Sequence, residues 1–135
     1  MENFNYKAHI AKIRQEHNVS QRRNIAFAVF QIGNDCGELI GISGEVTRPG
    51  TVEVPKQPFF ETFDVRDGHS RPYDSEYKLL GELASRYGQM PNIEFEGMVN
   101  LYTERPPCAS CRFVIQQFRL RFPNIMLMVN QERID

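Results

Sequence analysis

The sequence has few cysteines, no long apolar run and almost no net charge, and each shortage excludes a class of protein. Its three cysteines are an odd number, and two of them lie three residues apart, too close to act as a disulfide framework. We therefore expect the chain to work in a reducing compartment. No apolar run approaches the roughly 20 residues that a membrane-spanning helix needs, and residues 1–6 show no signal-peptide pattern.

The net charge of −1 gives no overall basic surface, so any contact with nucleic acid would depend on a local patch. The length of 135 residues and the hydrophobic content of 41% predict one domain, residues 1–135, with a real core. Neither an internal repeat nor a low-complexity tract interrupts it.

The hydrophobic pattern alternates between helical and strand periods. It predicts helices over 5–17, 74–87 and 108–122, and strands over 25–32, 39–43, 98–102 and 125–129. A turn at 33–37, containing Cys36, would join the first two strands into a hairpin. The continuous apolar run at 125–129 is typical of a central strand covered on both faces.

The order of these elements predicts the fold class. Strand, helix and strand over residues 98–129 imply a parallel, right-handed crossover, and the whole chain predicts a three-layer α/β/α sandwich with a mixed central sheet. Residues 45–73 form a long irregular segment, which usually carries function or is disordered. Its residues Phe59, Phe60 and Phe63 form either a minor core, which we favour, or a wall for a flat substrate.

Ligands of such sheets bind beyond the carboxyl ends of the strands, beside helix N-termini. One helix here begins after Pro106-Pro107 with Cys108-Ala109-Ser110-Cys111. Proline is favoured in a first helical turn, and the helix dipole stabilises thiolates there, the form that binds metal or attacks. The other helix begins with Asp74-Ser75-Glu76.

Glu76 lies on the inward face of its helix, four residues before Leu80. A buried carboxylate must be paired, metal-linked or protonated. A catalytic zinc typically has three protein ligands and one open position. Cys108 and Cys111 can supply two of these ligands, the neighbouring helix start should supply the third, and Glu76 suits the base beside the metal.

Asp74-Ser75-Glu76 followed by Pro107-Cys108-Ala109-Ser110-Cys111 resembles the paired motif of the zinc-dependent nucleic-acid and nucleotide deaminases, His-x-Glu followed by Pro-Cys-x-x-Cys. Asp-Ser-Glu-Tyr-Lys-Leu-Leu at 74–80 and Phe-Pro-Asn-Ile at 122–125 are similar to the deaminase domains of bacterial polymorphic toxins. The resemblance implies a cytidine-deaminase-like fold and the hydrolysis of cytosine to uracil in nucleic acid, with single-stranded DNA favoured over RNA or duplex DNA.

The resemblance also implies roles for single residues. Asp74, Cys108 and Cys111 would bind Zn²⁺, and Glu76 would carry the proton from water to the base and the departing ammonia. Asp74 stands where the family usually has histidine or cysteine. In the alternative it only caps the helix, and His69 is then the next candidate ligand.

Many of these deaminases contact the substrate through an asparagine after the second strand, where this chain has Ser43-Gly44. Candidates for substrate contact are therefore Ser43, Asn24 at the start of the hairpin, and Arg71 and Tyr73 in the long loop. Further loop arginines could contact phosphates around the site: Arg22, Arg23, Arg48, Arg66 and Arg105.

As a toxin-type domain, the chain would be the C-terminal part of a larger secreted protein, delivered into the cytoplasm of a target cell. Its expected partners are the nucleic acid and a cognate immunity protein, with no membrane partner. Three alternatives remain: a deaminase of free nucleosides or nucleotides, a redox module using Cys108 and Cys111, and a structural-zinc or plain binding domain. A redox module would give Glu76 no role. A structural zinc site requires four protein ligands, and the sequence has no second cysteine pair to supply them.

Overall fold

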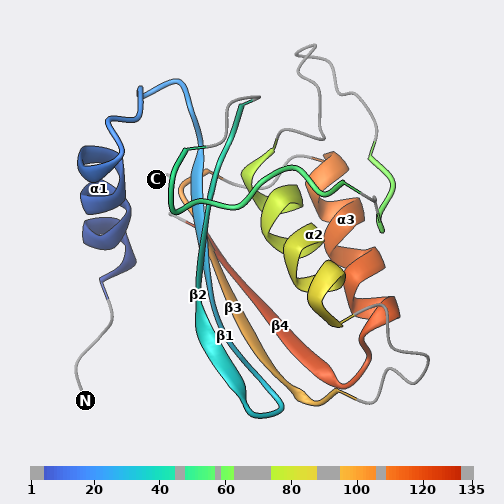
Figure 1. The fold of residues 1–135 in the computed structure, drawn as a ribbon. Coiled ribbons are helices and arrows are strands. Elements are labelled where there is room, and N and C mark those ends of the chain that lie inside the picture. Colours follow the sequence, from blue (N-terminus) through green and yellow to red (C-terminus); the bar gives the residue numbers. More distant parts are fainter. Residues whose placement is uncertain are drawn as a thin grey trace.

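The computed structural model describes residues 5–44, 48–56, 59–62, 74–87, 95–105 and 109–131. The helices are α1 (Tyr6–Glu16), α2 (Ser75–Tyr87) and α3 (Ala109–Arg121), and the strands are β1 (Ile25–Ile32), β2 (Asp35–Ile42), β3 (Gly97–Thr103) and β4 (Ile125–Gln131). Helices α2 and α3 cover one face of the sheet, and α1 lies against the other (Figure 1). The predicted α/β/α fold with a mixed sheet, of the cytidine-deaminase-like type, is confirmed.

The strand order is β2-β1-β3-β4. Strand β1 is antiparallel to β2 and β3, while β3 and β4 are parallel and connected through α3, which is the predicted crossover. The predicted turn at 33–37 is too long, because Ile32 pairs with Asp35 and Cys36 pairs with Gln31 inside the hairpin. Gly33 adopts φ +58°, a conformation that glycine allows at little cost and that lets the chain reverse within two residues.

Strand β4 is not the central, doubly covered strand that its apolar run predicts. It occupies the edge of the described sheet. Ile125 and Leu127 are buried, whereas Met126 and Met128, which alternate with them, are 59% and 44% exposed. The described helix on that face, α1, instead packs Ile10 and Ile13 over the start of β1, so it leaves the outer side of β4 uncovered.

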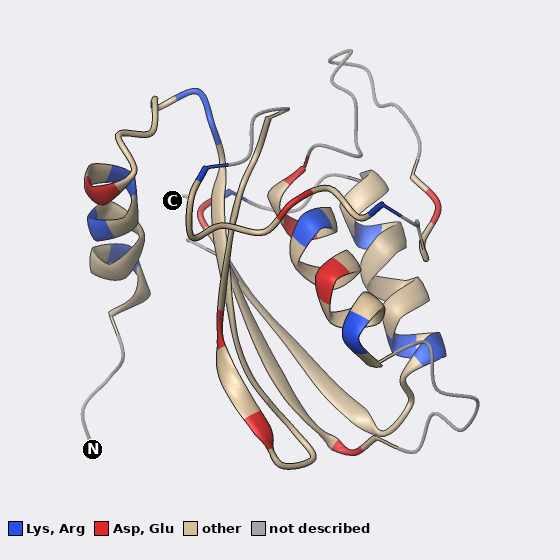
Figure 2. Cartoon of the chain, viewed as in Figure 1, with Lys and Arg blue, Asp and Glu red and all other residues tan. Residues whose placement is uncertain are grey.

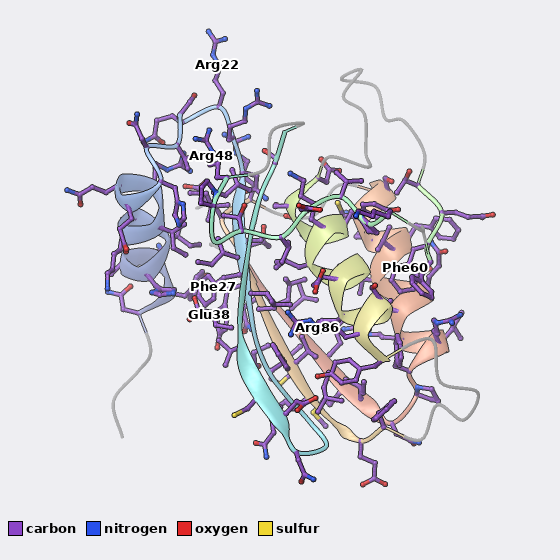
Figure 3. The ribbon with its side chains drawn as sticks, viewed as in Figure 1. Arg22, Phe27, Glu38, Arg48, Phe60 and Arg86 are labelled. Carbon is purple, nitrogen blue, oxygen red and sulfur yellow. The ribbon has the colours of Figure 1, made fainter. Side chains whose placement is uncertain are left out.

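The main core lies between the sheet and the pair α2 and α3. Phe60 is buried, and its ring centroid lies 6.1 Å from that of Phe118 in α3 (Figure 3). Phe59 packs against the same core, under the guanidinium of Arg121 at 4.9 Å. The minor-core interpretation of these two phenylalanines is therefore confirmed, while Phe63 lies outside the described residues.

Gly41 allows β2 to approach the first turn of α2. A Cβ atom at residue 41 would lie 2.7 Å from the backbone oxygen of Ser75 and 3.0 Å from Cγ of Leu79. The backbone of α2 cannot move aside as a flexible side chain can. The absence of a side chain at Gly41 therefore fixes how closely the turn that carries Glu76 lies against the sheet.

We expect Gly41→Ala to lower the free energy of unfolding by about 1–3 kcal/mol, because overpacking forces a backbone shift. Gly37→Ala in the same strand is the matched control, since its Cβ would meet only the rim of the Phe30 ring at 3.3 Å. Urea unfolding of both variants measures the difference. Equal losses in the two variants would contradict the importance of the contact between Gly41 and α2.

Candidate active site

The site lies where α2 and α3 begin, at the end of the sheet formed by the last residues of β2 and β3 and the first residues of β1. Figure 2 shows the acidic residues at the start of α2, at the same end of the molecule as the basic turn that precedes β1. Glu76 lies in the first turn of α2 and is only 4% exposed. The inward orientation that the sequence predicts for Glu76 is therefore present.

One carboxylate oxygen of Glu76 accepts hydrogen bonds from three side chains. The donors are Nδ2 of Asn24 at 2.6 Å, Oγ of Ser75 at 2.8 Å and Oγ1 of Thr103 at 2.9 Å. They come from the residue before β1, from α2 itself and from the end of β3. This network holds the carboxylate through Oε1 in one orientation.

Asn24 is the centre of this network. Its Nδ2 also lies 2.8 Å from Oγ of Ser75, and its Oδ1 accepts from the backbone N–H of Arg105 at 3.1 Å. The backbone N–H of Asn24 donates to Oγ of Ser43 at 2.8 Å. The structure thus brings Asn24 and Ser43 to the site, where their polar groups bond other residues of the protein.

Burial raises the pKa of Glu76 above its ordinary value, and the negative charge of Asp74 raises it further. Hydrogen bonds from Cys111, Ser75 and Thr103 act in the opposite direction, because they favour the ionised form. A carboxyl group under these opposing influences suits general acid–base chemistry, which works best when the group can both take up and release a proton near the operating pH.

Asp74 and Cys111 also meet at this place. Cys111, in the first turn of α3, is buried, and its Sγ lies 3.3 Å from Oδ2 of Asp74. The backbone oxygen of Asp74 accepts from the N–H of Lys78 at 3.1 Å, so Asp74 stands at the start of the helix while its side chain faces Cys111. A thiolate and a carboxylate side by side are donors that suit Zn²⁺.

Five sequence candidates lie outside the described residues: Arg66, His69, Arg71, Tyr73 and Cys108. Within the described part of the chain, no group of three or more His, Cys, Asp and Glu side chains gathers around a point where a metal ion could sit.

Sequence reasoning missed Thr103 and the hydrogen bond that Ser75 donates to Glu76. No motif marks Thr103, which comes to Glu76 only because β3 ends beside the start of α2.

Comparison with known proteins assigns the chain to a family. Residues 15–133 match the Toxin-deaminase family model, described as the BURPS668_1122 family of deaminases. No curated protein matches the sequence. Fold and family together define a hydrolytic deaminase of the cytidine-deaminase-like superfamily. The chain belongs to the Toxin-deaminase family.

None of the helices in the described residues combines the length and the apolar character that a membrane span requires.

We expect Thr103→Val to lower kcat for deamination by about 5- to 150-fold. Valine has nearly the same shape as threonine but removes one donor to Glu76, and a buried group that loses its partner costs about 1–3 kcal/mol, where 1.4 kcal/mol is about tenfold in rate. Thr103→Ser keeps the hydroxyl and should restore most of the rate. Steady-state kinetics of the two variants provide the test, and equal rates in both would show that the hydroxyl is irrelevant.

Proposed function

We propose that this protein is a zinc-dependent hydrolytic deaminase that converts cytosine to uracil in nucleic acid, most readily in single-stranded DNA, and acts as an interbacterial toxin. One observation carries the proposal. The Glu76 carboxylate is held by three donors at the point where the N-termini of two helices bring Asp74 and Cys111 within 3.3 Å of each other. The family assignment supports deamination as the chemistry of this site.

Asp74 and Cys111, together with Cys108 from the same Pro-Cys-x-x-Cys motif, would hold the metal. Bound zinc lowers the pKa of water to about 7 and so supplies a nucleophile at neutral pH. The thiol of Cys111 is well placed for this role, because the first turn of a helix stabilises the thiolate form.

Glu76 would move the protons. Its carboxylate takes a proton from the attacking water and delivers it to N3 of cytosine, the ring nitrogen beside the amine-bearing carbon. A C4–O bond forms, and Glu76 then takes the second proton from the new C4 hydroxyl and passes it to the amine. The C4–N bond breaks and ammonia departs, which leaves the C4 carbonyl of uracil. Because Oε1 is occupied by Asn24, Ser75 and Thr103, we assign the proton transfer to Oε2.

Two considerations favour a single strand as the substrate. The reacting base must leave the stack to reach a carboxylate that is only 4% exposed, and an unpaired base does so at the lowest cost. The turn before β1 also presents two exposed arginines, Arg22 and Arg23, which could contact the phosphates of a strand. Figure 3 shows Arg22 at the end of the sheet beside which α2 begins. An enzyme that damages nucleic acid in this way would need a cognate immunity protein in the cell that makes it.

A substrate panel tests the proposal. The zinc-loaded protein is incubated separately with single-stranded DNA, duplex DNA, RNA and free cytidine nucleotides, and nucleosides from each digest are identified by mass spectrometry. We expect deoxyuridine from single-stranded DNA, and none from Glu76→Gln protein. Hypoxanthine would show that the enzyme deaminates adenine instead of cytosine. Product from mononucleotides alone would show that the substrate is a free nucleotide and not a polynucleotide. No product from any substrate would contradict the proposal.

A further inference from the structure

Two cations approach Gly44, just after the end of β2. Nζ of Lys78 is buried and donates to the backbone oxygens of Ile42 at 2.8 Å and Gly44 at 2.7 Å. On the side-chain side, Nη1 of Arg23 lies 2.9 Å from the position that a Cβ atom of residue 44 would take. Gly44 adopts φ +120°, so only glycine suits both this backbone and the approach of Arg23.

Arg48 adds a third positive charge. One of its guanidinium nitrogens, Nη1, donates to the backbone oxygen of His17 at 3.2 Å, which anchors the side chain at this end of the sheet (Figure 3). Burial lowers the pKa of Lys78, and the charges of Arg23 and Arg48 lower it further. The charges of Arg23 and Arg48 therefore both act on Lys78. We call Arg23, Arg48 and Lys78 the basic cluster.

The basic cluster has no counter-charge among the described residues. Arg14 pairs with Glu104 and Arg86 with Glu82, whereas no described carboxylate pairs with a member of the cluster. Carbonyl groups satisfy two donors of Lys78 but do not neutralise its charge. Like charges gathered in a partly buried place repel each other, so a bound anion would stabilise this arrangement.

The basic cluster adjoins the Glu76 network through two covalent links. Arg23 directly precedes Asn24, whose amide donates to Glu76 at 2.6 Å. Ser43 lies between the two residues whose carbonyls bind Lys78, and its Oγ accepts from the N–H of Asn24 at 2.8 Å. An anion at the cluster would therefore lie beside the reacting base, where a nucleotide carries its phosphate.

We propose that Arg23 and Arg48, supported by the buried charge of Lys78, bind a phosphate group of the substrate next to the reacting base. The inference rests on the proposed function, because it takes the base to lie at Glu76. The phosphate belongs either to the backbone of a single strand or to a free nucleotide. Arg23 is the most direct contact, since it is exposed and no hydrogen bond engages its guanidinium within the described residues.

Binding of a fluorescein-labelled oligodeoxynucleotide tests the site independently of turnover. Anisotropy titrations at several salt concentrations, all in Glu76→Gln protein, give the affinity and its salt dependence. We expect Arg23→Gln to weaken binding about tenfold and to reduce the slope of log K against log salt by about 0.7, the loss of one phosphate contact on a single strand. Gly44→Ala, which fills the space that Arg23 approaches, should act in the same direction.

Arg86→Gln is the matched control. Arg86 lies in the last turn of α2, far from the start of the helix, and its charge is paired with Glu82 at 2.8 Å (Figure 3). Neither affinity nor slope should change in this variant. If Arg23→Gln behaves like Arg86→Gln, the phosphate site is wrong, even if the protein deaminates DNA.

Competition by small ligands identifies the source of the phosphate. Cytidine monophosphate and cytidine are titrated against the labelled oligonucleotide with Arg23 present and with Arg23→Gln. If Arg23→Gln weakens only the competition by cytidine monophosphate, the site binds the phosphate of a free nucleotide. If it weakens only the binding of the oligonucleotide, the site binds a phosphate of the strand backbone. Equal weakening of cytidine would overturn the proposal. If binding depends on salt and on Arg23 but the unmodified protein deaminates no substrate of the panel, the phosphate site is upheld and the proposed function is refuted.

Discussion

Glu76→Gln is expected to lower the rate constant for deamination by about 100- to 10,000-fold, the range that general acid–base groups contribute. Glutamine has the shape of glutamate and offers the same oxygen to Asn24, Ser75 and Thr103, but its amide cannot accept a proton at neutral pH. The substrate would still enter a site of unchanged shape. The loss should therefore appear in kcat, with a smaller change in KM.

The same substitution should not destabilise the fold. The folded protein pays a desolvation cost for the buried carboxylate, which is why burial raises the pKa of Glu76, and neutral glutamine avoids most of this cost. We expect an unfolding temperature equal to or above that of the unmodified protein. Glu82→Gln, on an outer face of the same helix, controls for loss of a negative charge and should keep full activity. Measurable turnover at the original rate in folded Glu76→Gln protein would refute the proton-transfer role.

Cys111→Ala is expected to lose bound zinc, activity and stability together. Cys111 is buried and its Sγ lies 3.3 Å from Oδ2 of Asp74, so alanine would remove a metal donor from the interior. A ligand present at about 1,000 times its dissociation constant stabilises a protein by about 4 kcal/mol, and the variant would lose a contribution of that size. Metal analysis after dialysis, and unfolding curves with and without a chelator, measure both effects.

Cys36→Ala provides the matched control, because Cys36 is exposed in β2. It should retain zinc and unfold as the unmodified protein does. A chelator should lower the unfolding temperature of this control but leave that of Cys111→Ala unchanged. Full zinc content in folded Cys111→Ala protein would contradict a ligand role for this cysteine.

Asp74→Asn separates the two interpretations of Asp74. Asparagine caps helices as well as aspartate does, so a residue that only caps α2 would tolerate this change with little effect on stability or metal content. A metal ligand would not, because the amide carries no charge. We expect weaker zinc retention with α2 intact, measured by metal analysis beside circular dichroism.

The sequence predicts most of the architecture because helical and strand periods are strong signals for amphipathic elements. Residues Ile10 and Ile13 of α1 are buried as their spacing indicates. The failures arise where one pattern fits two environments. The apolar run at 125–129 predicts a strand that is covered on both faces. In the structure, Met126 and Met128 are exposed on the outer face of β4, at the edge of the described sheet.

The sequence predicts the motif residues of the candidate site but not the hydrogen bonds that hold Glu76. Asp74, Glu76 and Cys111 stand at helix starts, and the resemblance to the zinc-dependent deaminases implies their roles. Asn24 was a candidate only by its position at the start of the hairpin. Thr103 gave no signal, because its contact with Glu76 spans 27 positions and depends on β1 pairing with both β2 and β3. Long-range hydrogen bonds of this kind follow from topology rather than from local pattern.

The most direct test of the account is the origin of the oxygen in the product. Single-stranded DNA containing cytosine is incubated with the zinc-loaded protein in ¹⁸O-labelled water, and the released nucleosides and ammonia are analysed by mass spectrometry. The account predicts deoxyuridine carrying the heavy oxygen at C4, one ammonia per deoxyuridine, and neither product with Glu76→Gln protein. Deoxyuridine without the label, or undiminished product from the Glu76→Gln protein, would contradict hydrolysis at this site.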